Sequence, residues 1–189
     1  MTREAAPMVG PVRVIGGRSR GRRLAARLPK SVRPTSDRVR ESIFDILGSL
    51  GGVDGLEVVD LFCGSGALGV EALSRGAASV TFVDHNPDAL AAVRQNLHAV
   101  GLEDASATLV RASLPAWLRT GTASRFDLAL CDPPYDFTDW RALLDTLQAE
   151  VAVLESGQSV ALPHGWMVAR ERRYGGTLVT VAQRSGDRS

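Results

Sequence analysis

From residue 57 onward the chain alternates between short strand-like runs and helix-like segments. Apolar, β-branched runs at 57–61, 79–83, 107–110 and 126–131 are followed by segments with helical spacing at 67–75, 87–100, 114–119 and 140–149. This alternation is typical of a parallel sheet with helices on both faces. Further strand-like runs occur at 151–154, 166–169 and 177–181, the last two flanking Gly175-Gly176. We therefore predict an α/β, doubly wound, mostly parallel seven-stranded sheet with an antiparallel hairpin at one edge.

The 189 residues suit one such domain with a short extension. We place the domain at 53–183, a basic N-terminal extension at 12–52, a disordered tail at 1–11 and a second tail at 184–189.

The extension itself reads as a hairpin followed by a helix. The runs 12–15 and 22–25 flank Gly16-Gly17 and predict the hairpin. Thr35 or Ser36 can cap the helix, and Gly48 with Gly51-Gly52 can end it.

The net charge of +1 hides a strong asymmetry. Between Arg13 and Arg40 there are ten basic residues and one acid, a net of +9, so the rest of the chain carries −8. A mildly acidic domain with a basic arm is the pattern of a polyanion binder. A solvated basic tail without a ligand is the alternative.

The composition also indicates the cellular compartment in which the protein works. Cys63 and Cys131 lie in no zinc-ligand spacing and are too few for a disulfide framework, so we expect no metal and a reducing, cytoplasmic location. No apolar run is long enough to span a bilayer, and we expect no membrane partner.

A glycine-rich motif follows the first strand of the alternation. Gly64, Gly66 and Gly69 lie where a strand turns into a helix, which lets the backbone approach a ligand closely. These glycines also fit a dinucleotide site or a tight turn without a ligand. Asp60 favours S-adenosylmethionine, because a carboxylate there can accept from a cationic amine but would repel a pyrophosphate.

An acid also follows the second strand. Asp84 is placed to accept hydrogen bonds from both ribose hydroxyls of a nucleoside cofactor, or alternatively to cap the helix near Pro87. Ser113, after the third strand, is the candidate for the adenine contact, although it could equally cap a helix. The full set of cofactor-binding candidates is Asp60, Phe62, Gly64, Ser65, Gly66, Asp84, His85 and Ser113.

The most informative motif is Asp132-Pro133-Pro134-Tyr135, directly after the fourth strand. In such sheets ligands bind outside the carboxyl ends of the strands, beside the glycine motif. Two prolines cannot donate hydrogen bonds, so the Asp132 carboxylate and the Pro133 carbonyl are fixed acceptors that suit an amino group. Tyr135 can stack on a base turned out of its helix. We expect these four residues to be catalytic, with direct methyl transfer and no covalent enzyme intermediate.

Together these motifs resemble class I S-adenosylmethionine-dependent amino-methyltransferases, which have a Rossmann-like fold. The sequence of the N-terminal part is similar to that of the RsmD family of bacterial rRNA methyltransferases. The stretches that carry this similarity are 13–17, 21–24, 33–42 and 64–76. The resemblance implies methylation of a guanine N2 in 16S rRNA, guanine 966 in the family's substrate, during small-subunit assembly. It also implies RNA contacts, for which the candidates are Arg18, Arg20, Arg22, Arg23, Arg33, Thr35 and Arg38.

The expected partner is therefore 16S rRNA or the assembling small subunit, bound by a monomer. Three other readings remain open: a DNA adenine-N6 or cytosine-N4 methyltransferase, a dehydrogenase that shares the glycines, and a non-catalytic rRNA-binding assembly factor. The absence of room for a target-recognition domain argues against the first. The intact Asp132 to Tyr135 motif argues against the other two.

Overall fold

A computed structural model of the protein describes residues 12–25, 37–120 and 125–186. Its strands are β1 (Glu57–Leu61), β2 (Ser79–Asp84), β3 (Ala107–Arg111), β4 (Phe126–Cys131), β5 (Ala149–Ser156), β6 (Trp166–Tyr174) and β7 (Thr177–Arg184). Its helices are α1 (Asp37–Ser49), α2 (Ala67–Ser74), α3 (Pro87–Ala99) and α4 (Trp140–Thr146), with a 3₁₀ helix η1 (Ala116–Thr120).

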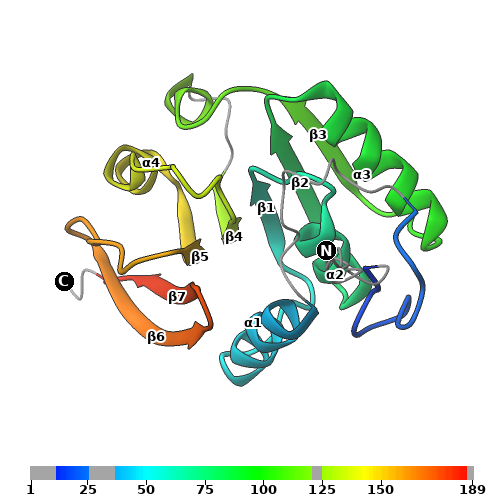
Figure 1. Ribbon diagram of the computed structural model, residues 1–189, viewed down its shortest axis with the longest axis horizontal. Coiled ribbons are helices and arrows are strands. Elements are labelled where there is room, and N and C mark those ends of the chain that lie inside the picture. The colour runs from blue at the N-terminus through cyan, green and yellow to red at the C-terminus, as the bar shows by residue number, and fades with distance from the viewer. Residues whose placement is uncertain (1–11, 26–36, 121–124, 187–189) are drawn as a thin grey trace, which may run out of the picture.

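The strands form one sheet in the order β3-β2-β1-β4-β5-β7-β6 (Figure 1). Strands β1 to β5 are parallel, and β7 runs antiparallel to both β5 and β6. The predicted fold class and edge hairpin are confirmed. Because β7 is reversed, the turn between β6 and β7 comes back to the edge at which β1, β4 and β5 end.

Some element boundaries differ from those predicted. We expected a helix over 140–149, but α4 ends at Thr146 and Leu147 is extended. Ala149 then pairs with Phe126 as the first residue of β5. The helix predicted over 114–119 is the 3₁₀ helix η1, and the two strands of the hairpin, β6 and β7, continue three to five residues further than expected, to Tyr174 and Arg184. The ends of the strands depend on pairing with neighbouring strands. The periodicity of a single segment carries no information about that pairing.

Each face of the sheet buries its own apolar cluster. Alternating side chains send Val58, Val80, Leu130 and Val153 to the face covered by α1, α2 and α3. The residues between them face α4 and η1. Among the described helices none has the length and apolar character needed to cross a membrane.

The predicted N-terminal hairpin is present and is docked on the domain. Arg13 bridges Arg23, and Val14 and Leu24 complete the backbone pairing across it. The amides of Ile15 and Gly16 donate to the carboxylate of Glu71 in α2, at 2.8 and 2.7 Å. We name residues 12–25 the arm. The tail at 1–11 and the caps proposed at Thr35 and Ser36 lie outside the described residues.

The glycine turn of the arm packs against the last residues of α2 and α3. The Arg18 amide donates to the carbonyl of Ser74, and the Ser19 hydroxyl donates to the carbonyl of Val100. Gly17 has a φ of +72°, and a Cβ there would lie 1.8 Å from the Ser74 carbonyl oxygen. Only glycine fits this close approach.

Candidate active site

Four acidic residues gather on one face of the sheet near its carboxyl edge. Asp84 ends β2, Asp60 lies in β1, Asp132 follows β4, and Glu155 lies near the end of β5. Residues two apart on a strand share a face, so these side chains point the same way as the core residues Phe82, Val58, Leu130 and Val153. The arrangement brings together Asp60, Asp84 and Asp132, as the sequence predicted.

The glycine motif forms a tight turn held by Asp84. Phe62, Gly64 and Gly66 have positive φ values of 59°, 52° and 76°. The Gly64 amide donates to one oxygen of Asp84 at 3.0 Å, and the Asn86 amide donates to the other at 2.9 Å. The capping alternative for Asp84 is not observed, because the helix cap is Asn86, which accepts from the Asp88 amide. Each Asp84 oxygen keeps a further lone pair for a hydroxyl.

Asp60 lies deeper and connects the sheet to α2. Its carboxylate accepts a hydrogen bond from the Gly69 amide at 2.9 Å, and only 1% of the residue is exposed. Burial is the main cause that holds the pKa of Asp60 well above its usual value; the Gly69 hydrogen bond opposes this shift, while the charges of Asp132 and Asp84 add to it. A cation bound beside Asp60 would relieve this cost.

Gly69 allows α2 to approach β2 closely. A Cβ at this position would lie 2.3 Å from a ring carbon of Phe82 and 2.9 Å from Val80. The third glycine of the motif therefore serves helix packing, while the first two shape the turn.

The Asp132 to Tyr135 motif forms a loop next to the glycine turn. The Phe137 amide donates to the Pro134 carbonyl at 2.9 Å and closes this loop. The Phe137 ring lies 5.1 Å from Phe62, centroid to centroid, so an aromatic contact joins the two motifs. Tyr135 is 74% exposed, which leaves its ring free to stack on a base.

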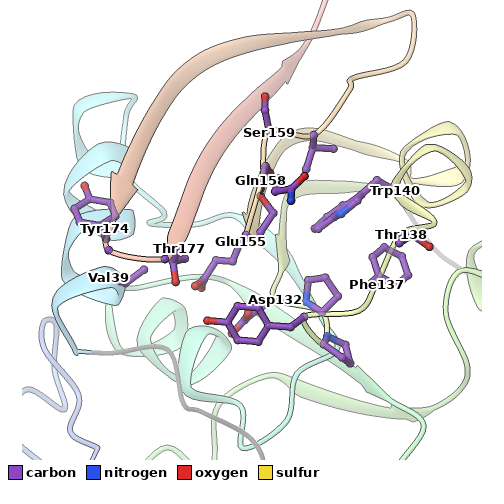
Figure 2. A pocket seen from close by; sticks show the side chains of 18 residues that line it. Val39, Asp132, Phe137, Thr138, Trp140, Glu155, Gln158, Ser159, Tyr174 and Thr177 are labelled. Carbon is purple, nitrogen blue, oxygen red and sulfur yellow. Dashed lines mark hydrogen bonds between the residues drawn. The ribbon is translucent and has the colours of Figure 1, made fainter.

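A cavity of about 660 Å³ opens beside Asp132, toward β5 and away from β1. Figure 2 shows the side chains that line it. Its walls come from the start of α1, the loop after β4, the end of β5 and the turn between β6 and β7. The glycine turn lines none of it. The Asp132 to Tyr135 loop thus separates two regions, one suited to a cofactor and one with room for a base.

The other predicted cofactor residues are accessible. Ser113 is exposed after β3 and His85 is exposed after β2, with its Nδ1 3.4 Å from an Asp84 oxygen. Both cysteines are buried, and burial raises the pKa of each thiol, so neither is an available thiolate. The described residues contain no cluster of side chains that could hold a metal ion.

The arm arginines do not join these motifs. Arg18, Arg20, Arg22 and Arg23 are exposed, but their turn lies where α2 and α3 end, away from the carboxyl edge (Figure 1). Arg38 is exposed beside Val39, which lines the cavity. Arg33 and Thr35 lie outside the described residues.

Sequence reasoning missed several residues of the cavity. Glu155 is one, and the others are Val39, Trp140, Tyr174 and Thr177. An acid directly after the apolar run 151–154 was the available signal for Glu155, since Asp132 directly follows the preceding strand-like run, 126–131, in the same way.

The sheet order, the glycine turn after β1 and the Asp-Pro-Pro-Tyr loop after β4 define the class: a Rossmann-like methyltransferase fold. The family model described as Conserved hypothetical protein 95 matches residues 12–183, and the chain belongs to this family, the RsmD family.

Relatives and solved structures agree with this assignment. The chain is 31% identical to Ribosomal RNA small subunit methyltransferase D of Escherichia coli K12, over 93% of this chain and 91% of that protein. It is also 31% identical to the protein of the same name from Haemophilus influenzae, over 88% and 90%. The structure of Escherichia coli yhhF matches with a TM-score of 0.80 and 30% identity, over 94% of this chain and 100% of that one.

A more distant structure shares the fold alone. Magnesium protoporphyrin IX methyltransferase of Synechocystis, solved with bound SAM, matches with a TM-score of 0.64 at 20% identity, over 78% of this chain and 79% of that one.

Proposed function

We propose that this protein transfers a methyl group from S-adenosylmethionine to the exocyclic N2 of a guanine in 16S rRNA, guanine 966 by family resemblance. The observation that carries the proposal is the position of Asp132 to Tyr135, between the glycine turn and a base-sized cavity. The named activity of the relatives supports the rRNA substrate. This substrate would place the reaction in the bacterial cytoplasm.

The residues around the glycine turn fit the cofactor. Asp60 is a buried carboxylate whose raised pKa reflects the cost of an uncompensated charge, and the cofactor's ammonium group would offset it. Asp84 offers both oxygens to the ribose, and Ser113 and His85 are accessible at the rim. When bound here, the cofactor supplies an electrophilic methyl group.

The chain's own residues would hold and orient the amine. The nitrogen of an aromatic amine is a poor nucleophile, because its lone pair is delocalised into the ring. The Asp132 carboxylate and the Pro133 carbonyl would accept its two hydrogens and stabilise the positive charge that develops on it. Tyr135 would hold the base by stacking. Proximity and fixed electrostatics then supply most of the rate.

RNA docking would use exposed cations on the extension, with Arg38 next to the cavity and the arm arginines further away. Because these cations span from the cavity to the ends of α2 and α3, a folded RNA is a better match than a short strand.

The test is transfer of labelled methyl from S-adenosylmethionine to small ribosomal subunits from cells lacking this protein, followed by nucleoside analysis. Label in N2-methylguanosine would support the proposal. Transfer to DNA instead would indicate the DNA amino-methyltransferase, and cofactor binding without any transfer would indicate an assembly factor.

A further inference from the structure

We propose that Glu155 is the residue that makes the site specific for guanine, by accepting a hydrogen bond from N1–H of the base while Asp132 holds the neighbouring N2 amino group. This inference rests on the proposed function and adds how the target base would be told apart from adenine and cytosine.

The register of the sheet places the two carboxylates side by side. Cys131, the last residue of β4, pairs with Leu154 of β5, and Asp132 and Glu155 directly follow the two members of this pair. Neighbouring strands lie about 4.8 Å apart, and in-register side chains point to the same face. Both residues line the same cavity, and Figure 2 shows Glu155 directed toward Asp132 from the neighbouring strand.

Glu155 is well buried for an acidic residue. It is 6% exposed, with Val179 as its partner on β7. Thr177 at the edge hairpin and Val39 of α1 line the same cavity. A carboxylate has about four lone-pair positions, so Glu155 can accept a further hydrogen bond from a donor that enters the cavity.

Guanine presents the donors that match this pair. Its N1–H and N2 amino group are adjacent donors on one edge, whereas the amino groups of adenine and cytosine adjoin a ring nitrogen that only accepts. An ionised carboxylate also only accepts. Guanine would therefore donate hydrogen bonds to Asp132 and Glu155 together, and the other two bases would set a lone pair against Glu155. The same argument separates this site from a DNA adenine or cytosine site, although both share the Asp-Pro-Pro-Tyr loop.

The experiment compares two bases in the same RNA. Small subunits are reconstituted with rRNA that carries either guanine or 2-aminopurine at the target position, and kcat/KM for methyl transfer is measured with each. 2-Aminopurine keeps the N2 amino group but has an acceptor at N1. The wild-type protein should prefer guanine by about 10- to 100-fold, the range expected for one well-placed specific contact.

The amide of Glu155→Gln can accept a hydrogen bond from N1–H of guanine or donate one to N1 of 2-aminopurine. This variant should therefore reduce the preference for guanine by at least about tenfold. Glu155→Met, which offers neither, should reduce it as well. The matched control is Glu150→Gln, an exposed acid on the same strand outside the cavity, which should keep the wild-type preference.

The outcomes separate the two proposals. A wild-type protein that does not methylate guanine contradicts the proposed function. A wild-type protein that methylates guanine, with a base preference unchanged in both Glu155 variants, overturns the role of Glu155. A variant whose fold is generally damaged would methylate guanine and 2-aminopurine more slowly by the same factor. The ratio of the two rates would then be unchanged, and this result would also contradict the role of Glu155.

Discussion

Arg40 of α1 and Glu71 of α2 face each other inside the protein, with a guanidinium nitrogen 3.9 Å from a carboxylate oxygen and side chains 1% and 0% exposed. Glu71 also accepts from two arm amides and pairs with Arg75. One buried carboxylate therefore ties the arm, α1 and α2 together.

Replacing Glu71 with alanine should lower the free energy of unfolding by about 3 kcal/mol, because two arm amides lose their acceptor and the buried Arg40 keeps only Asp37 as a carboxylate partner. Urea unfolding measures this. Glu103→Ala, at an exposed loop position, should change stability by no more than about 0.5 kcal/mol. Equal stability of the two variants would show that Glu71 does not hold the arm in place.

Replacing Asp132 with alanine should lower kcat by about 100- to 1,000-fold, the usual cost of removing one electrostatic contact to a developing charge. The dissociation constant of S-adenosylmethionine should stay within about threefold of wild type, since Asp84, the proposed ribose acceptor, ends β2, and β1 lies between β2 and β4. Turnover at the wild-type rate would remove Asp132 from the mechanism.

Asp60 should make stability depend on pH. Because its pKa is raised in the folded protein, the folded state holds a proton that the unfolded chain releases near pH 3.8. The contribution of protonated Asp60 to the free energy of unfolding is thus fully present below pH 3.8, and it is lost as pH rises through the raised pKa. Asp60→Asn should keep the Gly69 hydrogen bond, remove this pH dependence and stabilise the unliganded protein at neutral pH.

The same variant should bind S-adenosylmethionine about 10- to 100-fold more weakly, because a charged partner of the amine is gone. Calorimetry at pH 7 and urea unfolding between pH 4 and 8 provide the two readouts. Unchanged affinity would mean that Asp60 is a packing residue only.

Two glycine variants should have opposite effects. Gly69→Ala forces a methyl group against Phe82 and should destabilise the protein by about 1 to 3 kcal/mol, with weaker cofactor binding. Gly48→Ala in α1 meets no atom within 4 Å and should be neutral or stabilising by up to about 1 kcal/mol. Thermal unfolding of both variants checks this; a harmless Gly69→Ala would contradict the packing role of the third glycine.

Neutralising Arg20, Arg22 and Arg23 should weaken RNA binding and reduce the salt slope, log K against log salt, by about 2 to 3. Since these residues lie away from the cavity, kcat at saturating substrate should not change. Arg125→Gln, which breaks an exposed pair with Glu150, is the control. A wild-type salt slope in the triple variant would exclude the arm from the RNA interface.

The sequence predicted most of the fold because local patterns carried the information. Apolar runs and glycine turns located seven strands, and the chain order placed Asp60, Asp84 and Asp132 at one edge. What it missed depends on pairing between distant segments. The local pattern predicts a helix at Ala149, and only its pairing with Phe126 shows that this residue begins β5. Glu155 reads as the polar end of a strand until the register sets it beside Asp132.

The position of the arm was also beyond the sequence. The ten basic residues between Arg13 and Arg40 predicted a polyanion partner but not where the arm lies. Hydrogen bonds to Glu71 and Ser74, more than fifty residues away, hold the turn of the arm at the C-terminal end of α2.

The reversed strand β7 has a consequence for the order in which the protein is made. The segments that would hold the cofactor are complete once Tyr135 has been synthesised, whereas the cavity beside them needs the turn at Tyr174 to Thr177. A growing chain that folds as it leaves the ribosome would therefore form its cofactor region first, and it would complete the proposed rRNA-binding cavity only after 42 more residues, from Tyr135 to Thr177, had been added.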